Sequence, residues 1–195
     1  MSLEAELPRL ERLTPSERSE LLWLARQSIR TALRGEDPPT LSPLTPALSA
    51  PSAVFVSLHQ HNNLRGCIGT LLADRPLHET VAHTARAAAL DDPRFPALTE
   101  PELGSVDIEI SRLGPLVPAA PERVRVGVHG VSLRFGEHRS IFLPQVATLY
   151  GWDRDTLLRE LCEKAMLPPD AWQHPETQLM IFEAEVFGEN EPHAT

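Results

Sequence analysis

The sequence predicts an α+β fold in which a largely antiparallel sheet is flanked by helices. Two pairs of β-type runs are each joined by a short turn-type segment, which is the pattern of a β-hairpin. A further run, 106–111, alternates Val or Ile with Asp, Glu and Ser, which is typical of a strand that buries one face. Since the helical segments do not alternate with single strands, parallel βαβ units are not expected.

Length and composition are those of one ordinary globular domain. The chain has 195 residues, of which 42% are hydrophobic and 23% charged. A chain of this length buries about two-thirds of its unfolded surface, so it needs neither a disulfide nor a metal to fold. We predict a single domain over residues 14–190, built from two lobes, between an N-terminal tail (1–13) and a C-terminal tail (191–195).

The charge balance is acidic and excludes some classes of partner. The 18 Lys and Arg residues against 27 Asp and Glu give a formal net charge of −9. Binding to a phosphate backbone needs a concentrated basic face, and no run of five basic residues occurs, so nucleic acid is not an expected partner. No apolar run approaches the ~18 residues of a membrane span, so no membrane partner is expected either.

The cysteines and the first residues bear on the compartment. Cys67 and Cys162 form neither a CxxC pair nor a disulfide framework. Residues 1–13 alternate acids with Leu and lack the basic and apolar regions of a signal peptide. A reducing, cytoplasmic location is therefore the expectation.

The first helix is predicted directly after Thr14. Thr14 and Glu17 have the spacing of a capping box, and Pro15 suits the first helical position. Apolar residues then repeat at helical spacing until Gly35, which ends the helix. The segment 37–51 carries five prolines, so neither a helix nor a central strand is expected there, and we predict an extended crossover.

The first hairpin is predicted from the runs 53–60 and 64–72. The residues between them, 61–63, are His-Asn-Asn, which is turn chemistry. Pro76 then marks the first turn of a second helix, which ends near Asp91. The apolar face of this helix is rich in alanine, which indicates close packing against a neighbour.

The second hairpin is predicted from the runs 130–135 and 139–143. A Gly-Glu-His turn joins the two runs, and Pro144 ends the second. The last β-type run, 177–187, is predicted as one strand that ends at Gly188.

The third helix is predicted to begin at Asp153, a suitable N-cap, and to end before Pro168. Its apolar stripe comprises Leu157, Leu158, Leu161, Cys162, Ala165 and Met166. Cys162 lies within this stripe and is therefore expected in the core.

The most unusual segment is Leu64-Arg-Gly-Cys-Ile-Gly-Thr70, whereas P-loop, GxGxxG, GxSxG and HExxH motifs are absent. In a regular strand Arg65, Cys67 and Gly69 point to one face, and Gly66 and Gly69 leave the strand without side chains. This pattern fits a ligand that approaches bare backbone, with Arg65 binding its carboxylate or phosphate and favouring the reactive thiolate of Cys67. The structural alternative is a bulged strand with a small buried cysteine.

Two further pairs of polar residues are candidates for binding or proton transfer. Asp92 and Arg94 lie in a loop stiffened by two prolines, where they can bind a ligand or form an internal ion pair that fixes the loop. Glu109 and Ser111 share one strand face, and if that face meets Cys67 they can take a proton or orient a substrate. A solvated sheet face is the alternative.

The histidines do not predict a metal site. His59 and His61 would share a face only if the strand extended through both, and no third ligand is placed by spacing. We therefore predict no metal and no cofactor. His129 stands near two glycines and is a candidate for proton transfer, the alternative being a hydrogen bond that merely fixes a turn.

The segment Leu64-Arg-Gly-Cys-Ile-Gly69 resembles the signature of the AMME syndrome candidate gene 1 protein family, whose bacterial members are called AmmeMemoRadiSam system protein A. Other segments resemble the family in the same order: Asp92–Pro96, Ile108–Ser111, Gly127–Gly130, Leu143–Val146, Gly151–Asp153, Leu161–Ala165 and the closing Phe182 with Val186–Glu189. Together they cover about residues 15–190. One departure is Met166-Leu167, where relatives more often have Gly-Leu.

This resemblance implies a larger lobe around an antiparallel sheet, a smaller lobe, and a cleft between them that contains Arg65, Gly66 and Cys67. It also implies two partner proteins, a Memo-type protein and a radical S-adenosylmethionine enzyme. It implies no particular reaction.

Taken together, the residues favour an enzyme or enzyme component that binds a small or peptidic anionic ligand. In this hypothesis Cys67 is the nucleophile, Arg65 holds the anionic group, and Glu109, Asp92 or His129 transfers a proton or orients the ligand. The alternative is a non-catalytic adaptor that presents a ligand to partner enzymes, for which Arg65 matters more than Cys67.

Overall fold

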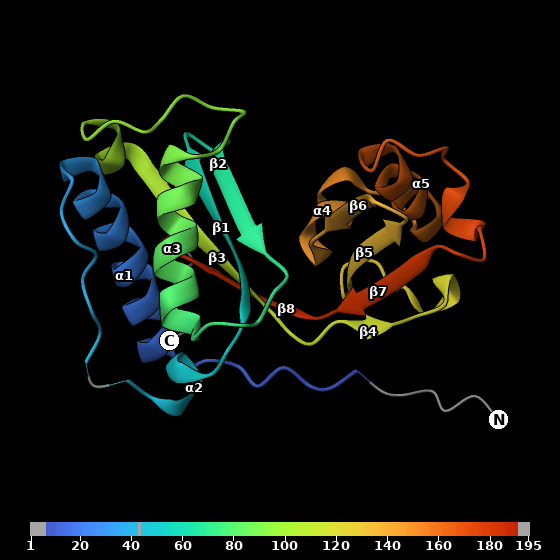
Figure 1. Ribbon diagram of the computed structural model, residues 1–195, viewed down its shortest axis with the longest axis horizontal. Helices are drawn as coiled ribbons and strands as arrows, with labels where there is room; N and C mark the ends of the chain where they lie inside the picture. Colours follow the sequence, from blue (N-terminus) through green and yellow to red (C-terminus); the bar gives the residue numbers. More distant parts are fainter. Residues whose placement is uncertain (1–6, 43, 191–195) are drawn as a thin grey trace. The chain divides into compact units, whose positions relative to one another are not determined.

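The computed structural model describes residues 7–42 and 44–190, which form two compact units (Figure 1). The larger unit comprises Glu11–Leu113 and residues 185–190. The smaller unit comprises Gly114–Ala184 and residues 7–10. Each unit has its own hydrophobic core.

The larger unit is built on a four-stranded sheet in the order β2-β1-β3-β8. Its strands are β1 (Ala53–Gln60), β2 (Asn63–Thr70), β3 (Val106–Leu113) and β8 (Ala184–Gly188). Strand β1 pairs antiparallel with both β2 and β3. His61 and Asn62 adopt positive φ angles of 51° and 64°, as the tight turn between β1 and β2 requires. The predicted hairpin is confirmed, although β2 ends at Thr70.

Two helices, α1 (Pro15–Arg34) and α3 (Leu77–Leu90), cover one face of this sheet (Figure 1). Helix α1 begins with the predicted capping box, because the Thr14 hydroxyl accepts the Glu17 N–H and the Glu17 carboxylate accepts the Thr14 N–H at 2.8 Å. Gly35 ends the helix in the left-handed conformation, with a φ of 69°. Leu13, just before α1, is buried in the same core, and its N–H donates to Glu185 at 3.0 Å.

The alanine-rich face of α3 lets the helix approach the sheet closely. A Cβ atom built on Gly66 of β2 would lie only 2.2 Å from the carbonyl oxygen of Ala88. Ala85 and Ala88 are fully or almost fully buried at this contact side of the core. The close packing predicted from the alanines is therefore confirmed.

The smaller unit is built on a second antiparallel sheet in the order β4-β7-β5-β6. Its elements are β4 (Val117–Pro118), β5 (Gly130–Phe135), β6 (His138–Phe142), β7 (Gln178–Phe182), α4 (Pro144–Tyr150) and α5 (Arg154–Lys164), with short 3₁₀ turns η2 (Pro121–Arg123) and η3 (Ala171–Gln173). Asp153 caps α5 by accepting the Thr156 N–H at 2.8 Å. Cys162 is fully buried in the core of this unit, as predicted.

Proline explains two differences from the sequence prediction. A one-turn helix, α2 (Pro46–Ser49), forms within the segment where no helix was expected, and α4 begins at Pro144, which was predicted only to end a strand. In both helices proline occupies the first turn, where its missing N–H removes no helical hydrogen bond and its fixed φ suits the helix. A proline that cannot lie inside a helix or a central strand can therefore occupy the first turn of a new helix.

Two further differences lie near the end of the chain. The run 177–187 forms two strands rather than one, because β7 and β8 are separated at Glu183 and belong to different sheets. Met166 was expected on the buried stripe of the third helix, but it is 85% exposed with a φ of 58°. It follows the end of α5, where the Leu167 N–H donates back to the Cys162 carbonyl, and this helix-ending geometry turns the side chain outward.

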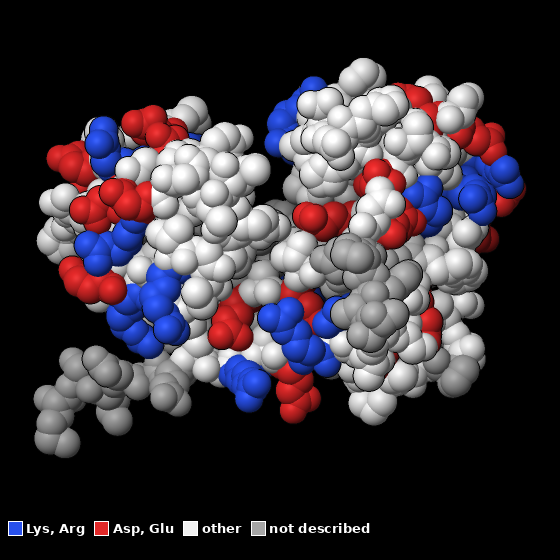
Figure 2. All heavy atoms as spheres, turned by 180° about the vertical axis from the view of Figure 1, so that it is seen from behind, with Lys and Arg blue, Asp and Glu red and all other residues white. Residues whose placement is uncertain are grey.

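The α+β class and the antiparallel pairing are thus confirmed. On the face seen in Figure 2, acidic and basic side chains are interspersed, with no broad basic area. Within residues 7–42 and 44–190, no helix combines the length and the apolar character needed to cross a bilayer.

A short 3₁₀ turn, η1 (Glu102–Ser105), completes the larger unit between α3 and β3. It places Glu102 near the start of β2, where it contacts Arg65.

Candidate functional site

Cys67 stands at one end of a row of polar side chains that crosses the larger sheet. Strand register places Cys67 in β2 opposite Ser57 in β1, and Ser57 opposite Glu109 in β3. The neighbouring residues Leu58 and Ile108 are buried toward α1 and α3, so this row lies on the other face of the sheet. The Ser57 hydroxyl donates to the Cys67 sulfur at 3.2 Å, and the thiol is partly exposed.

The backbone of Cys67 is held by two charged side chains from the loop after α3. Strand β2 is at the edge of the sheet, where backbone N–H and C=O groups have no neighbouring strand. The Asp92 carboxylate accepts the Cys67 N–H at 2.8 Å, and the Arg94 guanidinium donates to the Cys67 carbonyl at 3.0 Å. These two side chains therefore take the place of a fifth strand at this position.

Asp92 is a buried carboxylate that accepts several hydrogen bonds. It is 4% exposed and also accepts the Arg94 backbone N–H at 3.1 Å and two guanidinium N–H groups at 3.0 and 2.8 Å. These hydrogen bonds, those from the Arg94 side chain above all, hold the pKa of Asp92 well below its usual value. A carboxylate so stabilised in its charged form is a poor proton acceptor, so Asp92 acts as a positioning residue. The internal ion pair that was the alternative for this loop is present.

Arg94 is half exposed and places a guanidinium beside the thiol. The hydrogen bond to Asp92 is the main reason that its pKa is raised, and the Cys67 side chain also contributes. Its Nε and one terminal nitrogen are used by Asp92 and the Cys67 carbonyl, whereas Nη1 has no acceptor among the described residues. Arg94 therefore has one free donor edge next to Cys67.

Arg65 lies elsewhere than the sequence pattern predicts. Leu58 pairs with Gly66 and His59 with Leu64, so Arg65 is the extra residue of a β-bulge. The bulge interrupts the two-residue alternation that would place Arg65 on the face of Cys67. The Arg65 guanidinium instead contacts the Glu102 carboxylate, 3.3 Å away.

The two glycines of the motif have neighbours that account for their missing side chains. Gly66 faces the backbone of α3, as described above. At Gly69 the ring of Phe55, its partner in β1, occupies the space, and a Cβ atom would lie 2.1 Å from that ring. Close packing therefore requires glycine at both positions.

Glu109 and Ser111 share one face of β3, as its alternation predicts, and the strand register places them on the face of Cys67. Ser111 is buried and pairs with Phe55. Glu109 is two strands from Cys67, which corresponds to about 10 Å between backbones at the usual strand spacing of about 4.8 Å. A ligand that lies over Ser57 can reach both Cys67 and Glu109, whereas these two side chains are too far apart for direct proton transfer.

A pocket of about 350 Å³ adjoins this face at Glu109. Its polar lining includes His59 and Asp107, which pair across β1 and β3 in the row next to Ser57 and Glu109. Asn62, Glu189 and Asn190 complete its polar wall. The pocket gives the face a concave end where part of a ligand can be enclosed.

His129 belongs to the smaller unit. The ring Nδ1 of His129 accepts the Arg125 backbone N–H at 3.2 Å, and the backbone N–H of His129 donates to the Arg125 carbonyl at 2.9 Å. Burial is the main reason that its pKa is lowered, so the ring is neutral at pH 7. These bonds fix the turn before β5, which was the alternative for this residue.

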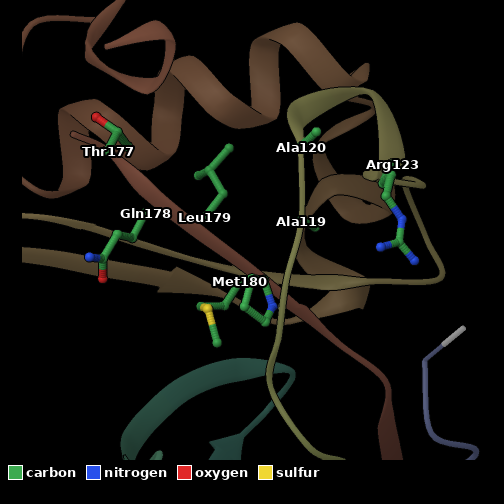
Figure 3. Close-up of a pocket in the computed structure, with 8 residues that line it drawn as sticks. Ala119, Ala120, Arg123, Thr177, Gln178, Leu179 and Met180 are labelled. Carbon is green, nitrogen blue, oxygen red and sulfur yellow. The ribbon is translucent and has the colours of Figure 1, made fainter. Parts of the chain in front are cut away.

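Two further features bear on the choice of site. His61 lies in the β1–β2 turn and not on the strand, and the described part of the chain contains no group of three His, Cys, Asp or Glu residues able to hold a metal ion. The smaller unit has a pocket of about 630 Å³ beside β4 and β7, lined by side chains of β7 and of the segment leading to η2 (Figure 3). None of the residues predicted from sequence lines it.

Ser57 was not identified from the sequence. Its signal is the hairpin itself, because counting back from the turn pairs Ser57 with Cys67, but only when the bulge at Arg65 is included. The alternation of one strand alone does not reveal it.

Comparison with known proteins identifies relatives of this chain in sequence and in structure. A family model described as AMMECR1 matches residues 22–187. A protein of Thermococcus onnurineus is 40% identical over 186 residues, covering 88% of this chain and 90% of the relative, and one of Methanothermobacter thermautotrophicus is 39% identical, covering 91% and 97%. The crystal structure of an uncharacterized protein from Pyrococcus horikoshii is similar with a TM-score of 0.84 and 35% identity, over 89% of this chain and 91% of that one.

Proposed function

The chain belongs to the AMMECR1 family, and on that premise we propose that it is an enzyme, or a component of an enzyme, that uses the Cys67 thiol as a nucleophile. The proposed ligand is small or peptidic and carries an anionic group, which binds at the free edge of the Arg94 guanidinium. Arg94 takes the role that the sequence pattern gave to Arg65, because it is the guanidinium beside the sulfur.

One observation carries the proposal: the backbone N–H, the backbone carbonyl and the sulfur of Cys67 each have a side-chain partner. A cysteine that only fills space needs none of these side-chain partners. Precise positioning of a partly exposed thiol is what attack on a bound ligand requires.

The arrangement supports a simple division of labour. In the proposed step the sulfur forms a bond to an electrophilic carbon of the ligand, and a leaving group departs with the bonding electrons and takes up the proton lost by the thiol. The Ser57 hydroxyl donates to the sulfur, and Arg94 orients the anionic part of the ligand. Glu109 and the pocket beside it bind the remainder of the ligand, across Ser57.

The test is competitive alkylation of the folded protein with iodoacetamide, with Cys67 and Cys162 quantified separately by mass spectrometry. We expect Cys67 to react in the folded protein and Cys162 to react only after denaturation. We also expect Ser57→Ala to change the alkylation rate of Cys67 in the folded protein by several-fold. The alkylation rate of Cys67 in the unfolded protein should not change. If both thiols are inert until denaturation, the nucleophile proposal fails.

A second candidate function is an adaptor that binds the same ligand without chemistry. The free donor edge of Arg94 favours it, because recognition of an anion needs only that group and a positioned backbone. For an adaptor, Arg94→Ala abolishes function while Cys67→Ser preserves it. For an enzyme with Cys67 as nucleophile, Cys67→Ser abolishes function. The Memo-type and radical S-adenosylmethionine partners, and the cytoplasmic location, stay predictions.

A further inference from the structure

The larger unit has a second pocket on the helical side of its sheet, away from the face of Cys67. It has a volume of about 500 Å³ and lies among α1, α3 and the Pro-rich segment that follows α1. Pockets that bind small molecules have volumes of about 300–1,000 Å³ and are mostly apolar with a few polar groups. The pocket has this size, and its lining has this composition.

The inner part of the pocket is apolar and rigid. Leu24 of α1, which is 1% exposed, and Ala82 of α3 line it from the two helices. Pro38, Pro39 and Leu41 form the wall opposite α3. Because proline has a fixed φ and no N–H, the two consecutive prolines limit the conformations open to this wall.

One side of the pocket is formed by one face of α3. Glu79, Ala82, His83 and Arg86 are spaced at i, i+3, i+4 and i+7, so they follow one another along the same side of the helix. The single acidic group, Glu79, is next to His78, whose Nε2 lies 4.0 Å from its carboxylate. The two ends of this face therefore differ in charge.

Arg86 provides the charge that lacks a counterpart. It forms no ion pair with any residue in the described part of the chain, and it is about 10 Å along the helix from Glu79 at a rise of about 1.5 Å per residue. His83, one turn before Arg86, is exposed and adds donor capacity at the same end. An apolar pocket with one unpaired guanidinium at its rim is complementary to a molecule with an apolar body and one anionic end.

We propose that this pocket binds an amphipathic carboxylate. The apolar chain lies over Leu24 and Ala82 against the proline wall, and the carboxylate receives hydrogen bonds from the Arg86 guanidinium. The site is separate from Cys67, because it is on the other face of the sheet, and it does not depend on the function proposed above.

The test is calorimetric titration of the full chain with decanoate and, separately, with decan-1-ol. We expect saturable binding of decanoate and weaker binding of the alcohol. Arg86→Gln raises the Kd for decanoate by about tenfold or more, since a charge-assisted hydrogen bond is lost, and leaves the Kd for decanol unchanged. Arg154→Gln, at an exposed arginine of the smaller unit paired with Asp155, is the matched control and leaves both values unchanged.

A second variant tests the pocket rather than the charge. Ala82→Leu places a larger side chain in the apolar part of the pocket and weakens the binding of both decanoate and decanol. A thermal melt establishes that the variant is folded. The proposal is overturned if the native chain shows no saturable decanoate binding at millimolar concentration, or if Arg86→Gln binds decanoate as well as the native chain does. The proposal is also overturned if the chain sediments with anionic lipid vesicles but does not bind decanoate, since the site would then be a membrane contact.

Discussion

The carboxylate of Asp92 lies 2.8 Å from the backbone nitrogen of Cys67, which precedes it by 25 residues. This bond connects the loop after α3 to the edge strand of the larger sheet, at the residue with the candidate nucleophile. Arg94 completes the connection through the Cys67 carbonyl. The position of the thiol therefore depends on a loop that contributes no atom to the proposed bond formation.

Asp92→Asn is expected to lower the free energy of unfolding by about 1–3 kcal/mol. The amide keeps the shape of the side chain but leaves Arg94 without its ionic partner and presents N–H groups where acceptors are needed. Urea denaturation at pH 7 measures the change. Asp155→Asn, at an exposed ion pair, is the control and should shift stability by less than about 0.5 kcal/mol. Equal effects of the two substitutions would contradict the role assigned to Asp92.

The stability due to Asp92 should disappear in acid. Because the folded pKa of Asp92 is below its unfolded value of about 3.9, the folded state binds fewer protons, so the contribution is complete above about pH 5 and is lost as the pH falls below about 4. The gap in stability between the native chain and Asp92→Asn is therefore expected to narrow between pH 6 and pH 3. Urea titrations of both proteins at several pH values test this, and parallel curves would show the assignment to be wrong.

Gly66→Ala is expected to destabilise the protein by about 1–3 kcal/mol. The added Cβ would meet the Ala88 carbonyl oxygen at 2.2 Å, so either β2 or α3 must shift. Gly104→Ala is the control, because nothing lies within 4 Å of the Cβ position there and its φ is not positive. Thermal unfolding of both variants gives the comparison, and a Gly66 variant as stable as the Gly104 variant would contradict the close approach of helix and strand.

Met166→Gly should stabilise the smaller unit by about 0.5–1 kcal/mol. Met166 has a φ of 58°, a conformation that costs an L-residue of this type free energy and costs glycine none. Its side chain is 85% exposed, so little packing is lost. Met166→Ala keeps the unfavourable backbone and is expected to give no gain. A decrease in stability on substitution by glycine would mean that this side chain makes contacts that offset the strain.

Several elements could be predicted because their signals lie within a few residues of one another. The capping box of Thr14 and Glu17 begins α1, and Gly35 ends it, since both act through backbone groups one turn away. The β1–β2 hairpin and the alternation of β3 are likewise local. These signals were sufficient for the α+β class, and the glycines beside Cys67 marked that segment as unusual independently of any family resemblance.

The arrangement of the candidate site required the tertiary structure. The bulge at Arg65, which turns that side chain toward Glu102, cannot be read from alternation, because one inserted residue leaves the composition of the strand unchanged. The division of 177–187 between two sheets depends on which edge each half meets, and the bond from Asp92 to Cys67 depends on where α3 ends relative to β2. The sequence by itself determined where α1, α3 and the two hairpins lie, because caps, turns and alternation act between near neighbours. Only the packing of those elements decided which guanidinium lies beside the thiol, since that contact joins residues far apart in the chain.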